Sequence, residues 1–428
     1  GKKFTFTDVI RADISDSQGA GQRPLTYVRQ LIAACALPQL MEESQLPSDV
    51  VSRARLTLDH CTGNTVGSVM LNGVRLIRQH VADFISERDG VQANINDVFV
   101  CSGVFHGTTL VMDLLKERKN GKRPGAMTCM PQYMAYFDFF EELGFHKILY
   151  HLDESNGWAH DISKMQRSLD ASLKFCDPRF LLVANPANPT GNNHKIRIHH
   201  GRRYNALSSN ERNTHFSHEI PLYFKMATAK KKTKEQLIAT LQQYINDDDD
   251  DDVGFLGVLN VNDMAKLQRD DPELRALIDH LEGRGSTVAL DCLVKPPKPG
   301  VPSYNLYNKE KNMIIKSLKD RAQLIQDTLN SIEGFYCSPV QAGMCGYPRV
   351  LLPRKAIDKA KSLGQDPSYF YVSQLLEKKG VCVTPGSAFG QPPGTCHSRV
   401  TILPPMAKVQ DMLGRIKDFH KEFTNQYK

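Results

Sequence analysis

The stretch that decides the fold is FLLVANPANPTG, residues Phe180–Gly191. Its first five residues, Phe180–Ala184, are apolar or small and predict a short buried strand. Asn185 and Pro186 end the strand, and the turn Asn188–Gly191 (Asn-Pro-Thr-Gly) follows. Ligands of α/β sheets bind at the carboxyl ends of the strands, so this turn is predicted to border a ligand site. A turn without any ligand is the alternative that local composition leaves open.

Predicted strands and helices alternate around this stretch. The sequence pattern predicts strands at 97–101, 127–130 and 147–152 and helices at 71–88, 104–119, 137–143 and 162–173. Further on it predicts a long helix at 313–332, strands at 337–352, 381–384 and 399–403, and helices at 373–379 and 409–423. The alternation indicates an α/β fold with a mostly parallel sheet between helices.

Composition restricts the class of protein. The 428 residues are 41% hydrophobic and 24% charged, which is typical of a globular chain. No run approaches the roughly eighteen apolar residues of a membrane span. The ten cysteines form no CxxC pair, which favours buried thiols over disulfides or a zinc site. A net charge of +7 is weak evidence for an anionic partner.

Several long blocks resemble alanine aminotransferase, a member of the fold-type I family that uses pyridoxal phosphate. These blocks are IRADISDSQGAGQRP (10–24), MPQYMAYFDFFEELGF (130–145), YHLDESNGWAHDI (150–162), ANPANPTGN (184–192), PPKPGVPSY (296–304) and VTPGSAFGQPPGTCHSRVTILPP (383–405). The resemblance covers residues 4–191 and about 253–428. It implies a large domain at 45–300 with a mixed, mostly parallel sheet between helices. It also implies a smaller α+β domain, made from residues 1–44 and 301–428, the latter including the interdomain helix.

The resemblance also assigns roles to three residues. A transaminase needs an aromatic ring over its cofactor, an amide for the cofactor's phenolic oxygen and an arginine for the substrate carboxylate. Tyr133, Asn188 and Arg399 match these three roles, and the planar fork of an arginine suits a carboxylate. The alternative is that they are remnants which keep only a structural role.

Other family features are missing from the sequence. The Asp-Glu-Val-Tyr strand, whose Asp binds the pyridine nitrogen, does not occur between residues 192 and 253. Asn246–Asp252, an Asn followed by six Asp, occupies the place of the Schiff-base lysine and of the phosphate-binding arginine. Carboxylates repel a phosphate and cannot form an imine. Bulky Val104 and Phe105 stand in the phosphate turn, and residues 65–70 lack the tyrosine that a neighbouring subunit lends.

These losses lead to the hypothesis of a catalytically inactive homologue without a cofactor, acting as a structural or assembly subunit of a larger complex. The replaced segment 192–252 is basic before its acidic run and contains interleaved aromatic residues, a pattern that favours RNA or an acidic protein as partner. A solvated insertion is the alternative. The candidate contact residues are Lys195, Arg197, Arg202, Arg203, Arg212, Lys230, Lys231 and Lys232. Five nearby histidines lack companion ligands, so no metal site is predicted.

An active alanine aminotransferase, transferring an amino group between alanine and 2-oxoglutarate, is the competing hypothesis. It requires a Schiff-base lysine at a shifted position, for which Lys230–Lys232 are the candidates. Family membership implies that the chain can form a homodimer. The expected compartment is the mitochondrion, with the cytoplasm as the alternative.

Overall fold

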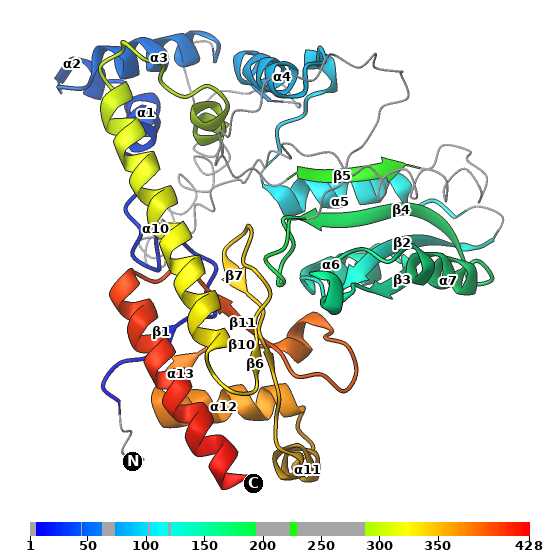
Figure 1. Cartoon of the computed structure of the whole chain (residues 1–428). Coiled ribbons are helices and arrows are strands. Elements are labelled where there is room, and N and C mark those ends of the chain that lie inside the picture. Colours follow the sequence, from blue (N-terminus) through cyan, green and yellow to red (C-terminus); the bar gives the residue numbers. More distant parts are fainter. Residues whose placement is uncertain are drawn as a thin grey trace, which may run out of the picture. The chain divides into compact units, whose positions relative to one another are not determined.

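A computed structural model of the chain (Figure 1) describes residues 6–43, 45–61, 73–101, 103–118, 121–193, 223–228 and 287–428. The chain divides into two compact units. The first unit comprises Gly1–Ser15, Met112–Leu256 and Asp320–Lys428, and the second comprises Asp16–Val111 and Gly257–Lys319. The domain boundaries at residues 44 and 300 stay predictions.

The first unit contains a four-stranded sheet with the order β3-β2-β4-β5. Its strands are β2 (Arg123–Met130), β3 (His146–His151), β4 (Cys176–Asn185) and β5 (Tyr223–Thr228). β2 runs parallel to β3 and β4, whereas β5 pairs antiparallel with β4. The prediction of a mixed, mostly parallel sheet is therefore confirmed.

Helices cover both faces of this sheet. Neighbouring residues of β2 point to opposite faces, as alternation along a strand requires. Ala126 packs with Phe140 of α6 (Ala135–Glu142), whereas Met127 packs in a separate cluster with Leu169 of α7 (Ile162–Ser172). Burial on both faces explains why residues 126–130 of β2 and 180–184 of β4 are nearly continuous apolar runs in the sequence.

The C-terminal part of the first unit joins short strands and helices. The strands β10 (Thr384–Pro385), β11 (Ser398–Thr401) and β7 (Cys345–Gly346) form an antiparallel sheet. β1 (Ile10–Arg11) pairs parallel with β9 (Val381–Cys382), and β6 (Phe335–Tyr336) pairs with β8 (Arg349–Val350). The helices are α11 (Arg354–Ser362), α12 (Pro367–Lys379) and α13 (Met406–Gln426). Pairing of β1 with β9 brings the N-terminal segment beside residues near 382.

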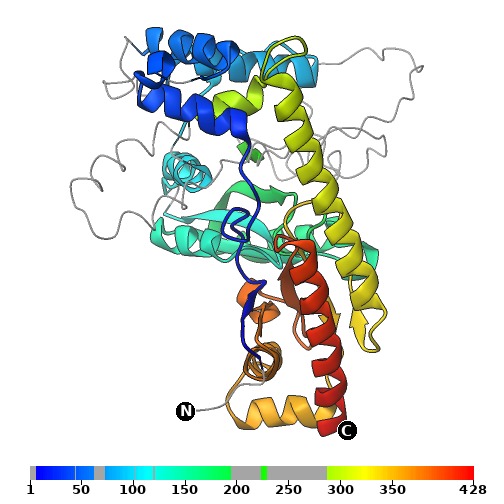
Figure 2. The same ribbon diagram turned by 90° about the vertical axis from the view of Figure 1, so that its left-hand side faces the viewer.

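The second unit is helical. It contains α1 (Thr26–Ala36), α2 (Leu40–Glu43), α3 (Ser48–Asp59), α4 (Arg75–Asp89), the short 3-10 helix at Ile95–Asp97 and the helical residues 287–294. Figure 2 shows α1 and α3 side by side, and Leu31 and Val50 share their buried cluster. α5 (Val104–Leu115) and α10 (Tyr304–Asn330) each begin in the second unit and end in the first.

The structure corrects two predicted strands. Residues 98–101 are not a strand, because the buried Arg78 side chain donates hydrogen bonds to the carbonyl oxygens of Ile95 and Val98, at 2.6 and 2.9 Å. Residues 337–352 form only the two-residue strands β7 and β8, and Pro348, which has no N–H for a ladder, lies between them. The helix expected at 234–245 lies outside the described residues. None of the helices in the described residues is long and apolar enough to cross a membrane.

Candidate functional site

Arg399 is the buried cation of the site. It is the second residue of β11, and only 7% of it is exposed. Its Nη2 donates to the backbone oxygen of Asp13 at 2.8 Å and more weakly to Thr384 Oγ1 at 3.5 Å, while its Nη1 donates to Asn188 Oδ1 at 3.2 Å. These acceptors come from three separate segments of the chain, which fixes the direction of the guanidinium. All three acceptors are neutral.

The side-chain carboxylate of Asp13 binds Arg11 and not Arg399. Arg11 donates from Nε and Nη2 to the two carboxylate oxygens of Asp13, at 2.8 Å each. Burial raises the pKa of the Asp13 carboxyl, but the hydrogen bonds and the charge of Arg11, together with a backbone hydrogen bond, more than offset burial, so the Asp13 pKa is lowered. Among the described residues, no Asp or Glu side chain forms an ion pair with Arg399. Buried charges are usually paired, so Arg399 can accept an anion as a further partner.

The turn that carries Asn188 is tightly anchored. The Gly191 N–H donates to Ala187 O at 2.9 Å, and Gly191 O accepts from the backbone N–H groups of Gln341 and Ala342. Gly191 has φ 67°, and a Cβ there would lie 2.4 Å from Cys345 O, so only glycine fits. Because the carbonyl oxygen of Asn188 binds Arg399, its NH₂ group is the part that can donate to a ligand.

Tyr133 lies in the turn that follows β2. The buried Gln132 shapes this turn, because its Oε1 accepts from the Tyr133 N–H at 2.9 Å and its Nε2 donates to Thr128 Oγ1 at 3.1 Å. The Gln132 N–H donates to Phe389 O at 2.9 Å. Tyr133 is half-buried against the clusters on the sheet. The turn therefore offers an aromatic ring on a rigid support.

The turn before α5 belongs to the second unit. Gly103 has φ 93°, and its N–H donates to Cys101 O at 2.8 Å before the helix begins at Val104. Burial raises the pKa of the Cys101 thiol, so this cysteine is a poor nucleophile. The turn is present as predicted, without the strand expected before it.

The remaining predicted site residues lie outside the described residues. They are Lys195, Arg197, Arg202, Arg203, Arg212, Lys230, Lys231 and Lys232, and the acidic run 247–252 lies there too. The proposed contacts of these basic residues with RNA or a partner stay predictions, as does the absence of a metal site at the histidines.

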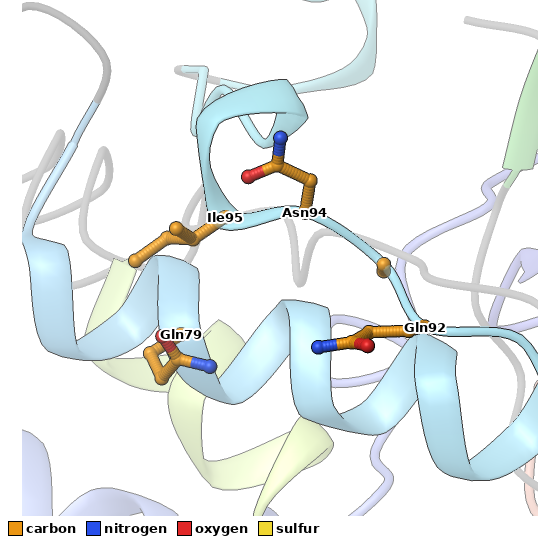
Figure 3. Close-up of a pocket in the computed structure, with 5 residues that line it drawn as sticks. Gln79, Gln92, Asn94 and Ile95 are labelled. Atoms are coloured by element: carbon orange, nitrogen blue, oxygen red, sulfur yellow. The ribbon is translucent and has the colours of Figure 1, made fainter.

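The second unit also has a hollow of about 350 Å³, shown in Figure 3. Its lining consists of the side chains and backbone of Gln79, Gln92, Ala93, Asn94 and Ile95. None of these lining residues is ionisable, so the hollow offers hydrogen bonds and no acid, base or nucleophile. The chemistry of the described residues is concentrated around Arg399.

Sequence reasoning missed three neighbours of Arg399: Asp13, Thr384 and Phe389. The Arg399 guanidinium lies over the Phe389 ring, with Cζ 4.9 Å from the ring centroid. All three residues fall within blocks that resemble the family, so the signal was present in the sequence. The sequence does not show that the three residues meet at Arg399, because their meeting depends on β1 pairing with β9 and on β10 pairing with β11.

Comparisons with known proteins show which family the chain resembles. The family model for class I and II aminotransferases matches residues 41–196. Over all of this chain, an alanine aminotransferase 2-like protein of Danio rerio is 36% identical (80% of its length), and alanine aminotransferase 1 of Homo sapiens is 35% identical (89% of its length). A probable mitochondrial alanine aminotransferase of Dictyostelium discoideum is 32% identical over all of this chain and 83% of its own length.

A solved structure supports the fold. The alanine aminotransferase of Pyrococcus furiosus superposes with a TM-score of 0.59, covering 97% of this chain and 93% of its own. At 18% identity, this likeness concerns the fold alone. It agrees with the fold-type I architecture that the sequence predicted.

The relatives overturn two expectations. The hypothesis of an inactive structural subunit in an RNA-protein assembly is wrong, because the full-length relatives are named alanine aminotransferases. The expectation of no cofactor is also wrong, because aminotransferases work with pyridoxal phosphate. Both errors came from giving the replaced segment 192–252 more weight than the preserved carboxylate side of the site.

The part of the site that the structure describes fits pyridoxal phosphate. Asn188 has an NH₂ group for the phenolic oxygen, and Tyr133 provides a ring on a rigid turn. Arg399 lies in the same site, with its guanidinium held by Asp13, Thr384 and Asn188. The positions expected for the lysine and for the phosphate-binding arginine fall among residues 229–286, outside the described residues.

Proposed function

The chain belongs to the family of class I and II aminotransferases, and we propose that it acts as a pyridoxal-phosphate-dependent alanine aminotransferase. It exchanges an amino group between alanine and 2-oxoglutarate. The observation that carries this proposal is Arg399, a buried cation bound by three neutral oxygens and by no carboxylate of the described residues. Both substrates have an α-carboxylate that can complete this site.

The residues of the chain have separate tasks in this reaction. Arg399 binds the α-carboxylate through its planar fork and thereby orients the α-carbon. Asn188 would hold the phenolic oxygen of the cofactor through its NH₂ group, and the Tyr133 ring would cover the cofactor and exclude water. Bound pyridoxal phosphate supplies the electron sink that makes the α-proton of the amino acid acidic.

The sequence does not identify the lysine that would bind the cofactor as directly as it identifies Arg399. Lys230, Lys231 and Lys232 are the candidates, at a shifted position relative to the family. A lysine with a lowered pKa is the usual nucleophile for a carbonyl cofactor. Reduction with borohydride and mass spectrometry of the labelled peptide identifies the residue that binds the cofactor.

We also propose a cellular location and an oligomeric state for the chain. The name of the Dictyostelium relative supports a mitochondrial location, with the cytoplasm as the alternative. A homodimer is proposed because enzymes of this family commonly form dimers. Sedimentation of the purified chain tests the dimer, and fractionation of cells tests the location.

The activity is tested by incubating the purified chain with pyridoxal phosphate, alanine and 2-oxoglutarate and measuring pyruvate. The expected result is steady pyruvate formation and a visible absorbance band that shifts on addition of alanine. Absence of both, from a chain that is folded by circular dichroism, would overturn the proposal.

A further inference from the structure

Phe389 is the aromatic residue beneath the Arg399 guanidinium. It ends the 3-10 helix at Gly386–Phe389, and Gly390 follows with φ 68°. Only 3% of Phe389 is exposed, and Arg399 Cζ lies 4.9 Å from its ring centroid. The face of an aromatic ring carries negative potential, so it attracts a guanidinium placed over it.

The Phe389 ring also contacts a second aromatic residue. The Tyr347 ring stands at 89° to it with centroids 6.0 Å apart, and Tyr347 itself stacks on His397 at 4.8 Å and 5°. The Tyr347 hydroxyl donates to Gly386 O at 3.2 Å, and His397 Nε2 lies 3.0 Å from Glu154 Oε1. These contacts fix the ring on the 3-10 helix that carries it.

His397 and Arg399 are two residues apart along the same chain segment. Side chains two apart in an extended segment lie on the same face. The rings of His397, Tyr347 and Phe389 therefore form a row that leads to the guanidinium. The Phe389 ring blocks movement of the Arg399 guanidinium toward it, and the three hydrogen bonds of Arg399 fix the direction of the guanidinium.

Phe389 also contacts the cofactor side of the site. Its backbone oxygen accepts from the Gln132 N–H at 2.9 Å, and Gln132 Oε1 binds the backbone N–H of Tyr133 at 2.9 Å. One residue thus supports Arg399 through its ring and the Tyr133 turn through its carbonyl. A shift of Phe389 would disturb both.

We infer that Phe389 is a positioning residue, which presents the Arg399 guanidinium to the substrate carboxylate and keeps it in register with the Tyr133 turn. The inference rests on the proposed function for its substrate, a 2-oxo or 2-amino acid. The competing explanation is that Phe389 only fills space in the core. The two explanations differ in one respect, because a cation–π contact depends on the electrons of the ring and packing depends on its shape.

The first experiment replaces Phe389 by mono-, di- and trifluorinated phenylalanine, which nearly preserve shape and progressively remove negative potential from the ring face. Binding of 2-oxoglutarate to the full chain is measured by calorimetry without an amino donor. The expected result is a dissociation constant that rises stepwise with each fluorine, within about 3- to 30-fold in total. An unchanged dissociation constant across the series would overturn the role of the ring face.

The second experiment compares Phe389→Leu with Phe389→Tyr and with Phe370→Leu, a buried phenylalanine that packs on Phe423 instead. Phe389→Leu is expected to weaken 2-oxoglutarate binding within the same range, whereas Phe389→Tyr restores it. Phe370→Leu should lower thermal stability without changing affinity. Equal losses of affinity in both leucine variants would show that Phe389 acts only through packing.

A third measurement does not depend on catalysis or on a bound cofactor. Phenylglyoxal modifies accessible arginines, and mass spectrometry of the peptide containing Arg399 gives its rate. In Phe389→Leu this rate should increase several-fold relative to Phe370→Leu, and in Phe389→Tyr it should stay near that of the wild type. If wild-type chain forms no pyruvate yet shows these rates, the proposed function fails and the positioning role stands. Equal rates in the two leucine variants would overturn the positioning role.

Discussion

Arg53 and Arg399 are two arginines with little exposure, and they differ in the source of their counter-ion. Arg53 donates from Nε and Nη2 to Asp291 Oδ2, at 2.9 and 2.6 Å, and His80 Nδ1 lies 2.6 Å from Asp291 Oδ1. This charge is neutralised by the protein itself. Arg399 binds only neutral oxygens among the described residues.

The difference separates a structural cation from a binding cation. Asp291 is fully buried, and its carboxylate joins α3, α4 and the helical residues 287–294 through Arg53 and His80. An arginine with its own carboxylate has nothing left to offer a ligand anion. An arginine held by a backbone carbonyl, an amide oxygen and a hydroxyl keeps its charge for the substrate. The predictions below test this contrast.

The largest effect is expected when the counter-ion of Arg53 is removed. Asp291→Asn leaves a nearly buried guanidinium without its anion, which should lower the free energy of unfolding by about 3 to 5 kcal/mol. Chemical denaturation measures the loss. Asp113→Asn, which removes an exposed partner of Lys116, is the matched control and should change stability little. A small loss for Asp291→Asn would show that Arg53 does not depend on its ion pair.

The next effect is expected on catalysis and not on stability. Arg399→Lys keeps the charge but loses the planar fork, so kcat/KM for alanine should fall about 30- to 1,000-fold. Steady-state kinetics measures the fall, and Arg354→Lys on exposed α11 is the control. If kcat/KM were unchanged, the substrate carboxylate would bind elsewhere.

A third variant would turn Arg399 into a cation of the Arg53 type. Asn188→Asp places a carboxylate at the position that now accepts from Arg399 Nη1 at 3.2 Å. The new ion pair should compete with the substrate and raise KM for 2-oxoglutarate about 10- to 100-fold, within the range of a close charge pair. Thermal melting should show unchanged or higher stability. Asn193→Asp, an exposed change in the same turn, should leave KM as it is.

The smallest effect is expected for Asp8, a partly exposed carboxylate that pairs with Lys408 and Arg415. Hydrogen bonds from Lys408 and then from Arg415 lower the pKa of Asp8 to about 2, from 3.8 in an unfolded chain. A lowered pKa stabilises the fold above pH 3.8, and this contribution is lost as the pH falls toward 2. Asp8→Asn should therefore lower the melting temperature slightly at pH 6 and not at pH 2. High salt should weaken the effect at pH 6, and an effect that salt leaves intact would contradict its surface origin.

Most elements of the sheet were predictable because their signal is local. β2, β3 and β4 are apolar runs bounded by turn residues, and α6 and α7 carry helical spacing between them. The strand expected at 97–101 is not formed, because Ile95–Asp97 is a 3-10 helix and the carbonyl oxygen of Val98 accepts from the Arg78 side chain. The single strand expected at 337–352 is not formed, because the backbone of this segment pairs with other strands only at β7 and β8.

The sequence alone determined the family, the Asn-Pro-Thr-Gly turn and the identities of Tyr133, Asn188 and Arg399, because each lies in a block with a recognisable local pattern. Only the tertiary structure decided that Arg399 meets Asp13, Thr384 and Phe389. Pairing of β1 with β9 brings Asp13 to Arg399, and packing of the Phe389 ring brings Phe389 to it. Neither contact leaves a periodic trace in the sequence. The sequence gives the position of an arginine along the chain, but the fold decides which groups surround its charge.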